Sequence, residues 1–138
     1  MANFDIAYKR TAQFEGGYVY DPDDNGGETY AGISRKANPK WAGWKTIDAA
    51  KKKYGSGFKN KLAGDVVLKQ QVKTLYRTNY WNPIWGDRIV RQEVANEIYD
   101  FGVNAGVATS IKLQQRQFKM KQTGVMNEAL LSKLNSVK

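Results

Sequence analysis

One segment of the chain gathers acidic residues in a protein that is otherwise strongly basic. It reads FEGGYVYDPDDNGGETY, from Phe14 to Tyr30, and the whole chain has 22 Lys and Arg against 13 Asp and Glu. Two carboxyl groups in different environments can cleave a glycosidic bond, one as the proton donor and the other in its ionised form. The segment is therefore a candidate catalytic loop.

The carboxyl groups of Glu15 and Asp24 are expected to lie in different surroundings. Residues 3–15 have apolar side chains at helical spacing, so Glu15 falls on the last turn of an amphipathic helix, where burial would help it to hold a proton. Asp24 lies nine residues later in a turn with many backbone donors, which would keep it ionised. Thr29 offers a hydroxyl that could hold the attacking water. We predict Glu15, Asp24 and Thr29 as the catalytic residues.

Other carboxylates of the loop leave alternatives open. Asp21 and Glu28 are rivals of Asp24 for the role of the second carboxylate. The alternation of Asp21, Asp23 and Asn25 is also typical of a calcium loop, but position twelve of such a loop, counted from Asp21, is Gly32 instead of the required glutamate. We therefore expect no metal site.

Several side chains are candidates for binding the sugar chain. Tyr18 and Tyr30 flank the acidic loop and could stack on sugar rings, although packing inside the protein explains either of them as well. Trp81 could line the cleft or belong to the core. Asn104 could reach the substrate, but an amide that bonds the backbone is the more common arrangement.

The composition excludes several classes of function. The chain has 138 residues, no Cys and no His, which removes disulfides, thiol nucleophiles, Ser-His-Asp triads and the usual zinc sites, and we expect no cofactor. No apolar run is long enough to span a bilayer, and the first residues, MANFDIAYKR, do not resemble a signal peptide. We expect synthesis in the cytoplasm, followed by holin-type or nonclassical release to the periplasm or cell wall.

Hydrophobic periodicity predicts a mainly α protein with an irregular loop or small hairpin after the first helix. After the helix over 3–15, Thr46–Tyr54 is expected to be helical, residues 55–64 to be a loop, and a long helix to run from Asp65 to the Asn82-Pro83 stop. Three further helices are expected in the remainder of the chain, over residues 91–104, 107–121 and 127–136. We predict one domain, 1–138, with a catalytic part (1–90) and a helical part (91–138) packed on it.

The quoted segment resembles the opening of glycoside hydrolase family 108. Members of that family read Glu-Gly-Gly-Tyr, then Asp-Pro, then Gly-Gly-Glu-Thr, and here the sequence is EGGYVYDPDDNGGETYAGIS. LYRTNYWNP (75–83) is similar to the family's Tyr-Trp helix end, and IYDFGVNAGVATSIKLQQR (98–116) is similar to its predicted peptidoglycan domain. TGVMNEALLSKLN (123–135) departs from the family ending, because Thr123 stands where Asp is usual and Asn127 where Gly is usual.

This resemblance implies a lysozyme-like helical fold and an N-acetylmuramidase activity. It implies cleavage of the β-1,4 bond between N-acetylmuramic acid and N-acetylglucosamine, in phage lysis or in wall remodelling, with Glu15 as the catalytic glutamate. A looser similarity to phage-type lysozymes, in which Asp and Thr follow the Glu at comparable spacing, implies Asp24 and Thr29 as its partners. Here the spacing from Asp24 to Thr29 is one residue shorter than in those enzymes.

Alternative functions remain at this point. A lytic transglycosylase would use one glutamate and release an anhydro sugar, whereas a wall-binding or secretion-associated protein would keep the fold without activity. We expect the protein to be a monomer that binds peptidoglycan glycan strands. We expect no insertion into membranes. A specific nucleic-acid partner is disfavoured by the acidic loop and by the lack of a recognisable motif, since a net charge of +9 alone gives only unspecific attraction.

Overall fold

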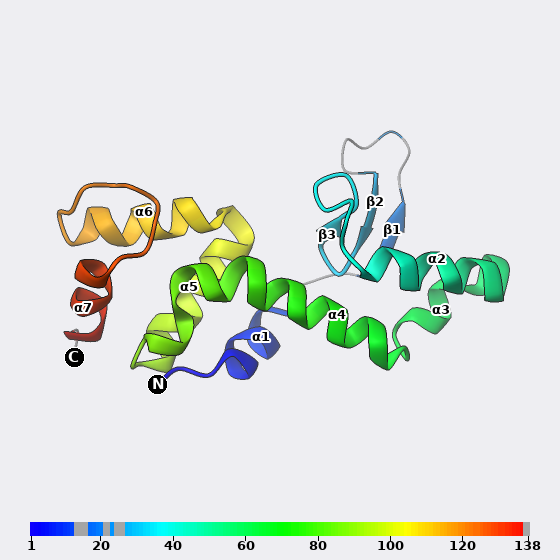
Figure 1. The fold of residues 1–138 in the computed structure, drawn as a ribbon, viewed down its shortest axis with the longest axis horizontal. Coiled ribbons are helices and arrows are strands. Elements are labelled where there is room, and N and C mark those ends of the chain that lie inside the picture. The colour runs from blue at the N-terminus through cyan, green and yellow to red at the C-terminus, as the bar shows by residue number, and fades with distance from the viewer. Residues whose placement is uncertain (13–16, 21–22, 24–26, 137–138) are drawn as a thin grey trace. The chain divides into compact units, whose positions relative to one another are not determined.

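The computed structural model describes residues 1–12, 17–20, 23 and 27–136 of the chain. Contacts divide the chain into two compact units, the first formed by Met1–Thr11 and Tyr76–Lys138 and the second by Ala12–Leu75. Helices dominate both units, and a small antiparallel sheet lies in the second (Figure 1). The predicted mainly α fold is thus confirmed. The division into residues 1–90 and 91–138 stays a prediction.

The first unit combines helix α1 (Phe4–Ala12) with the helices of the second half of the chain. Its other long helices are α5 (Gln92–Ala105), α6 (Val107–Gln117) and α7 (Glu128–Ser136). Short helical turns connect α4 to α5, namely η2 (Arg77–Trp81), η3 (Asn82–Ile84) and η4 (Gly86–Arg88). The Asn127 side chain accepts a hydrogen bond from the Leu130 backbone N–H at 2.8 Å. Asn127 thereby starts α7 as an N-cap residue should.

An aromatic cluster forms the centre of this unit. Phe4, Trp81 and Tyr99 are all buried. Their ring centroids lie 5.6 Å apart for Phe4 and Trp81 and 5.9 Å apart for the other two pairs, in tilted or edge-to-face geometry, which is the arrangement that aromatic pairs prefer. The indole Nε1 of Trp81 donates a hydrogen bond to Asp87 Oδ1 at 2.9 Å, so the polar atom of this buried ring is satisfied. Trp81 lies so close to Gly86 that a Cβ on Gly86 would sit 2.2 Å from the ring.

The second unit places a three-stranded sheet beside helix α2 (Gly43–Tyr54). Strands β1 (Tyr18–Tyr20), β2 (Glu28–Tyr30) and β3 (Ile33–Ser34) pair in that order, all antiparallel, with Tyr18 opposite Tyr30 and Tyr20 opposite Glu28. The unit continues through η1 (Gly55–Gly57), α3 (Lys59–Leu62) and α4 (Val66–Tyr76). Figure 1 shows the sheet and α2 close together within this unit.

The predicted helices are present, although the helix expected over 107–121 ends at Gln117. Two further differences have physical reasons. Residues 55–64 contain η1 and α3 where a loop is expected, because two short helical turns satisfy the backbone without needing an apolar stripe. The predicted long helix is α4 followed by the wider turn η2, which ends at Trp81. Helical spacing along this segment predicts that Val66 shares the inward face with Val72 and Tyr76, but Val66 is 77% exposed, because Leu68 completes the buried face of α4 instead.

We predict that Gly86→Ala destabilises the protein by about 1–3 kcal/mol, the usual cost of overpacking, because the new methyl group must displace the buried Trp81 ring. Urea unfolding followed by tryptophan fluorescence measures the change. Gly57→Ala is the matched control, since a Cβ there meets nothing within 4 Å, and it should leave the stability unchanged or slightly raised. Equal stability of the two variants would contradict this packing.

Candidate active site

The predicted catalytic residues fall partly outside the described structure. Glu15, Asp24 and the rival Asp21 belong to residues 13–16, 21–22 and 24–26, which lie outside the described residues. Thr29 and the rival Glu28 are described, and both lie on strand β2. The structure therefore defines strands β1 and β2, which flank the acidic loop in the sequence.

Strand β2 places the Thr29 hydroxyl beside strand β1. Thr29 pairs with Val19 in the sheet, and its Oγ1 donates to the Val19 carbonyl at 3.4 Å. A hydrogen bond of this length is weak. The side chain is half-buried. Its hydroxyl is thus held at the sheet without being strongly committed to another group.

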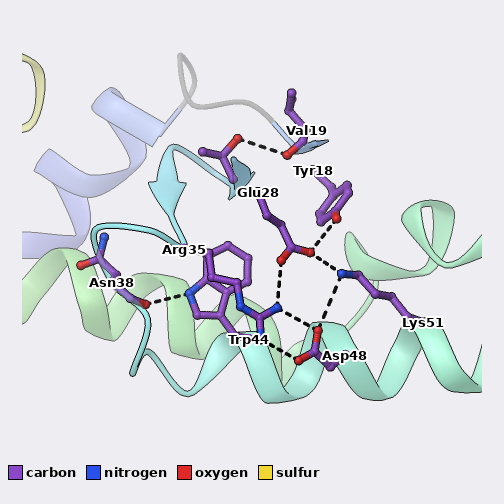
Figure 2. A network of polar contacts seen from close by, with 9 residues as sticks. Tyr18, Val19, Glu28, Arg35, Asn38, Trp44, Asp48 and Lys51 are labelled. Carbon is purple, nitrogen blue, oxygen red and sulfur yellow. Dashed lines mark hydrogen bonds and ion pairs between the residues drawn. The ribbon is translucent and has the colours of Figure 1, made fainter. Parts of the chain in front are cut away.

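Glu28, the neighbour of Thr29 on β2, is the centre of a polar network (Figure 2). Only 8% of its side chain is exposed. Tyr18 donates its hydroxyl to Oε2 at 2.6 Å, Arg35 donates Nη1 to Oε1 at 2.8 Å, and Lys51 Nζ donates to Oε2. The carboxylate thereby joins strand β1, the segment after β3 and helix α2.

Arg35 extends the network to a second carboxylate. Its guanidinium donates to Asp48 twice, with Nη1 to Oδ1 at 2.9 Å and Nη2 to Oδ2 at 2.8 Å, the paired geometry that makes such contacts strong. It also lies over the Trp44 ring, 5.3 Å from the ring centroid, where a cation is attracted to the aromatic face. The Trp44 indole in turn donates to the Asn38 carbonyl at 2.8 Å. Arg35 is consequently fixed on three sides, which gives Glu28 a rigid partner.

The network keeps Glu28 ionised. Burial by itself raises the pKa of the Glu28 carboxyl, but the hydrogen bonds from Lys51, Tyr18 and Arg35 together outweigh burial, and the pKa lies below its ordinary value of 4.5, as expected where donors stabilise the charged form. For Tyr18, burial and then the hydrogen bond to Glu28 raise the pKa, so the phenol stays a proton donor to the carboxylate.

This arrangement suits Glu28 to a structural role. A general acid must carry a proton near neutral pH, whereas Glu28 is held ionised by two cations and a phenol. Its oxygens are already engaged by these donors, which makes it a poor competitor of Asp24 for an attacking water. The geometry instead fixes the strand that carries Thr29.

The predicted sugar-binding tyrosines are both built into the second unit. The Tyr18 ring packs edge-on against Phe58, with centroids 5.0 Å apart, and Lys51 and Lys59 lie over it. Tyr30 is half-buried, and desolvation, followed by the negative charge of Asp65, raises its pKa. Packing therefore accounts for the position of Tyr18, the alternative that the sequence left open.

The two candidates in the first unit differ in exposure. Trp81 is fully buried in the aromatic cluster, so it presents no surface to a ligand. Asn104 is exposed, although its Nδ2 donates to the Asp100 carbonyl one turn earlier at 2.8 Å. Its amide is thus satisfied by the helix backbone.

Asp100 also connects α5 to the helix that leads into the acidic segment. The hydroxyl of Thr11, 3% exposed, donates to Asp100 Oδ1 at 2.9 Å. Thr11 precedes Glu15 by four residues in the chain. The bond thereby anchors the last described turn of α1.

Sequence reasoning missed the cations that hold Glu28. Arg35 and Lys51 lie seven and 23 residues beyond it, and Asp48 and Lys51 are three residues apart on α2. The spacing of Asp48 and Lys51 is a detectable signal of a shared helix face. The sequence gives no signal that this face of α2 packs against strand β2.

The described residues contain no cluster of three or more acidic side chains arranged to hold a metal ion. Within the same part of the chain, no helix has both the length and the apolar character of a membrane span.

We predict that Glu28→Gln lowers the stability by about 2 kcal/mol, between the small effect of surface ion pairs and the larger cost of breaking buried ones. Because the pKa of Glu28 is lowered by folding, its stabilisation is present above the unfolded-state value and is lost as the pH falls through the folded-state value. The wild-type protein should therefore lose stability below about pH 4.5, and the variant should lose less over that range.

Asp48→Asn is the matched control for this measurement. Asp48 contacts the same two cations, but its side chain is 42% exposed. Its replacement should therefore cost less than about 1 kcal/mol, the usual limit for an exposed ion pair. Urea unfolding between pH 3 and pH 7 tests both variants. A larger loss for Asp48→Asn than for Glu28→Gln would refute the central position of Glu28.

Comparisons with known proteins agree with the sequence motifs. The family model described as Glycosyl hydrolase 108 matches residues 8–106. Among solved structures, SagA of Brucella abortus is similar with 27% identity and a TM-score of 0.66, over 98% of this chain and 70% of that one. A search of curated proteins gives no match. Because the matched range covers most of the chain and includes Glu15, Asp24 and Thr29, the protein belongs to the Glycosyl hydrolase 108 family.

Proposed function

We propose that this glycoside hydrolase cleaves peptidoglycan at the β-1,4 bond between N-acetylmuramic acid and N-acetylglucosamine. The observation that carries the proposal is the family match over residues 8–106, which includes the whole acidic segment. A basic protein is also attracted to the anionic cell wall, since the net charge is +9. The proposed place of action is the cell wall or periplasm, in phage lysis or wall remodelling, where this polymer is found.

In the proposed mechanism, Glu15 is the general acid. It donates a proton to the glycosidic oxygen as the bond to the leaving sugar breaks. Asp24 acts as the ionised partner, which either activates the attacking water or stabilises the positive charge that develops on the sugar ring. Thr29 positions the water through its hydroxyl, and its weak bond to Val19 leaves that hydroxyl free to turn toward it.

The Glu28 network supports this assignment, because a carboxylate that is engaged by three donors is poorly suited to activate water. An ionised carboxylate engaged by Lys51, Arg35 and Tyr18 contributes rigidity at the base of the loop. A small displacement of a reacting group lowers the reaction rate strongly. Thr29 can position water only if strand β2 is held in a fixed place.

Glu15→Gln tests the general acid. We predict a loss of roughly 10²–10⁴-fold in cleavage of purified peptidoglycan, the usual contribution of general acid-base catalysis, with the fold retained. Turbidity loss gives the rate, and circular dichroism verifies the fold. Glu97→Gln is the control, because Glu97 is exposed and lies on α5 of the other unit, and it should keep full activity.

The products decide the reaction class. Mass spectrometry of the released fragments should find reducing N-acetylmuramic acid ends, which result from hydrolysis. Anhydro sugars would assign a lytic transglycosylase instead. An inactive wild-type protein that still binds the wall would refute catalysis in favour of a binding role.

Thr29 variants test the water-positioning role. We predict that Thr29→Ala slows cleavage roughly tenfold to hundredfold, the scale on which a misplaced reacting group acts, whereas Thr29→Ser keeps most of the activity. Both variants should unfold at nearly the wild-type urea concentration, because the hydrogen bond to Val19 is weak. If Thr29→Ser were as slow as Thr29→Ala, the hydroxyl would have no part in the reaction.

A further inference from the structure

A group of lysines on α2 and α3 carries positive charge without an acidic partner in the described part of the chain. We call Lys45, Lys52, Lys53, Lys59 and Lys61 the α2–α3 lysine surface; all five are exposed. None of the ion pairs found among the described residues uses any of them. Their charge is therefore available to an outside partner.

Aromatic rings bring these lysines together across the two helices. Lys53 of α2 and Lys61 of α3 both lie over the Tyr54 ring, at 5.3 and 5.5 Å from its centroid. Lys59 of α3 lies over Tyr18 at 5.6 Å, where Lys51 of α2 also lies. Like charges repel, so their convergence on shared rings favours the arrival of an anion between them.

A shallow hollow of about 460 Å³ adjoins these lysines within the second unit. Its lining includes Lys45, Lys53 and Tyr54. Asp65 is the acidic residue of the lining, and its Oδ1 already accepts a hydrogen bond from the Leu68 backbone N–H at 3.0 Å. With two lysines and one aspartate in its lining, the hollow keeps a net positive charge and has room for a narrow chain.

We propose that the α2–α3 lysine surface binds a linear polyol-phosphate polymer of the cell wall and so holds the enzyme at its substrate. The proposal rests on the proposed function, because it assumes that the protein acts at the wall. All the cations of the surface are lysines, which bind phosphate as mobile point charges and so suit a flexible chain that offers no fixed paired geometry.

Two other polyanions fit the surface less well. Single-stranded nucleic acid is held by stacking of its bases on free aromatic rings, but lysines already lie over Tyr54 and Tyr18. A lipid bilayer presents a broad surface that does not enter a hollow. A flexible chain with one phosphate in each repeat satisfies both the charge and the shape.

The test compares two variants of equal net charge. Lys53→Gln/Lys59→Gln/Lys61→Gln removes three charges of the surface, and Lys112→Gln/Lys121→Gln/Lys133→Gln removes three exposed charges of the other unit, so both variants fall from +9 to +6. The probe is purified poly(glycerol phosphate), with the dissociation constant measured by calorimetry at several salt concentrations. Circular dichroism verifies that both variants fold.

We expect the first variant to bind the polymer at least about tenfold more weakly and its salt dependence to fall by about two units of slope, since three phosphate contacts are lost from a flexible polyanion. The dissociation constant of the control variant should change by less than about threefold, because its lost charges act on the polymer only at long range. An equal loss in both variants would overturn the proposal, because net charge would then explain the binding.

Two further binding measurements distinguish the polymer from nucleic acid and from a lipid surface. Short single-stranded DNA and vesicles of anionic phospholipid, offered at equal phosphate concentration, should bind more weakly than the polymer, and tighter binding of either would overturn the assignment. Cleavage of peptidoglycan stripped of the polymer should be equal in the two variants. If the wild type fails to cleave it, the proposed function fails, while the polymer affinities still decide the proposal about this surface.

Discussion

The contact between the Glu28 carboxylate and its three donors is the constraint on which the strands beside the acidic loop depend. A nearly buried carboxylate is unstable unless it is paired and hydrogen-bonded, and Lys51, Arg35 and Tyr18 meet both requirements. Since these donors come from β1, from the segment after β3 and from α2, satisfying one charge fixes the position of three elements. Asp48 and the Trp44 ring hold Arg35 in turn, so the rigidity does not depend on a single side chain.

The same physical logic divides the acidic residues of the opening segment by role. A carboxylate held by cations stays ionised and contributes structure, whereas a proton donor needs an environment that disfavours its charged form. Glu28 satisfies the first condition, and the proposed mechanism gives the second to Glu15. Positive charge is likewise divided in the second unit. Arg35 and Lys51 are committed to Glu28, whereas the lysines of the α2–α3 surface have no acidic partner among the described residues.

Local patterns in the sequence predicted the helices and the family, but not the contacts that organise the site. The stripe through Phe4, Ala7 and Thr11 and the cap at Asn127 depend on neighbours three or four residues away, so periodicity detects them. The partners of Glu28 and the burial of Trp81 depend on residues from separate elements, and spacing along the chain does not encode these meetings. Phe101 illustrates the limit, because helical spacing predicts that it faces inward and it is 40% exposed, while Tyr99, two residues earlier, is buried.

The most direct test of this account is an NMR titration of the Glu28 side-chain carboxyl carbon in the wild-type protein. The account predicts that its midpoint lies below 4.5, the ordinary value for glutamate, because three donors stabilise the ionised form. In Lys51→Met, which lacks one of these donors, the midpoint should move upward. A wild-type midpoint above 4.5 would contradict the account, since burial would then outweigh the three donors and the network would not favour the ionised form.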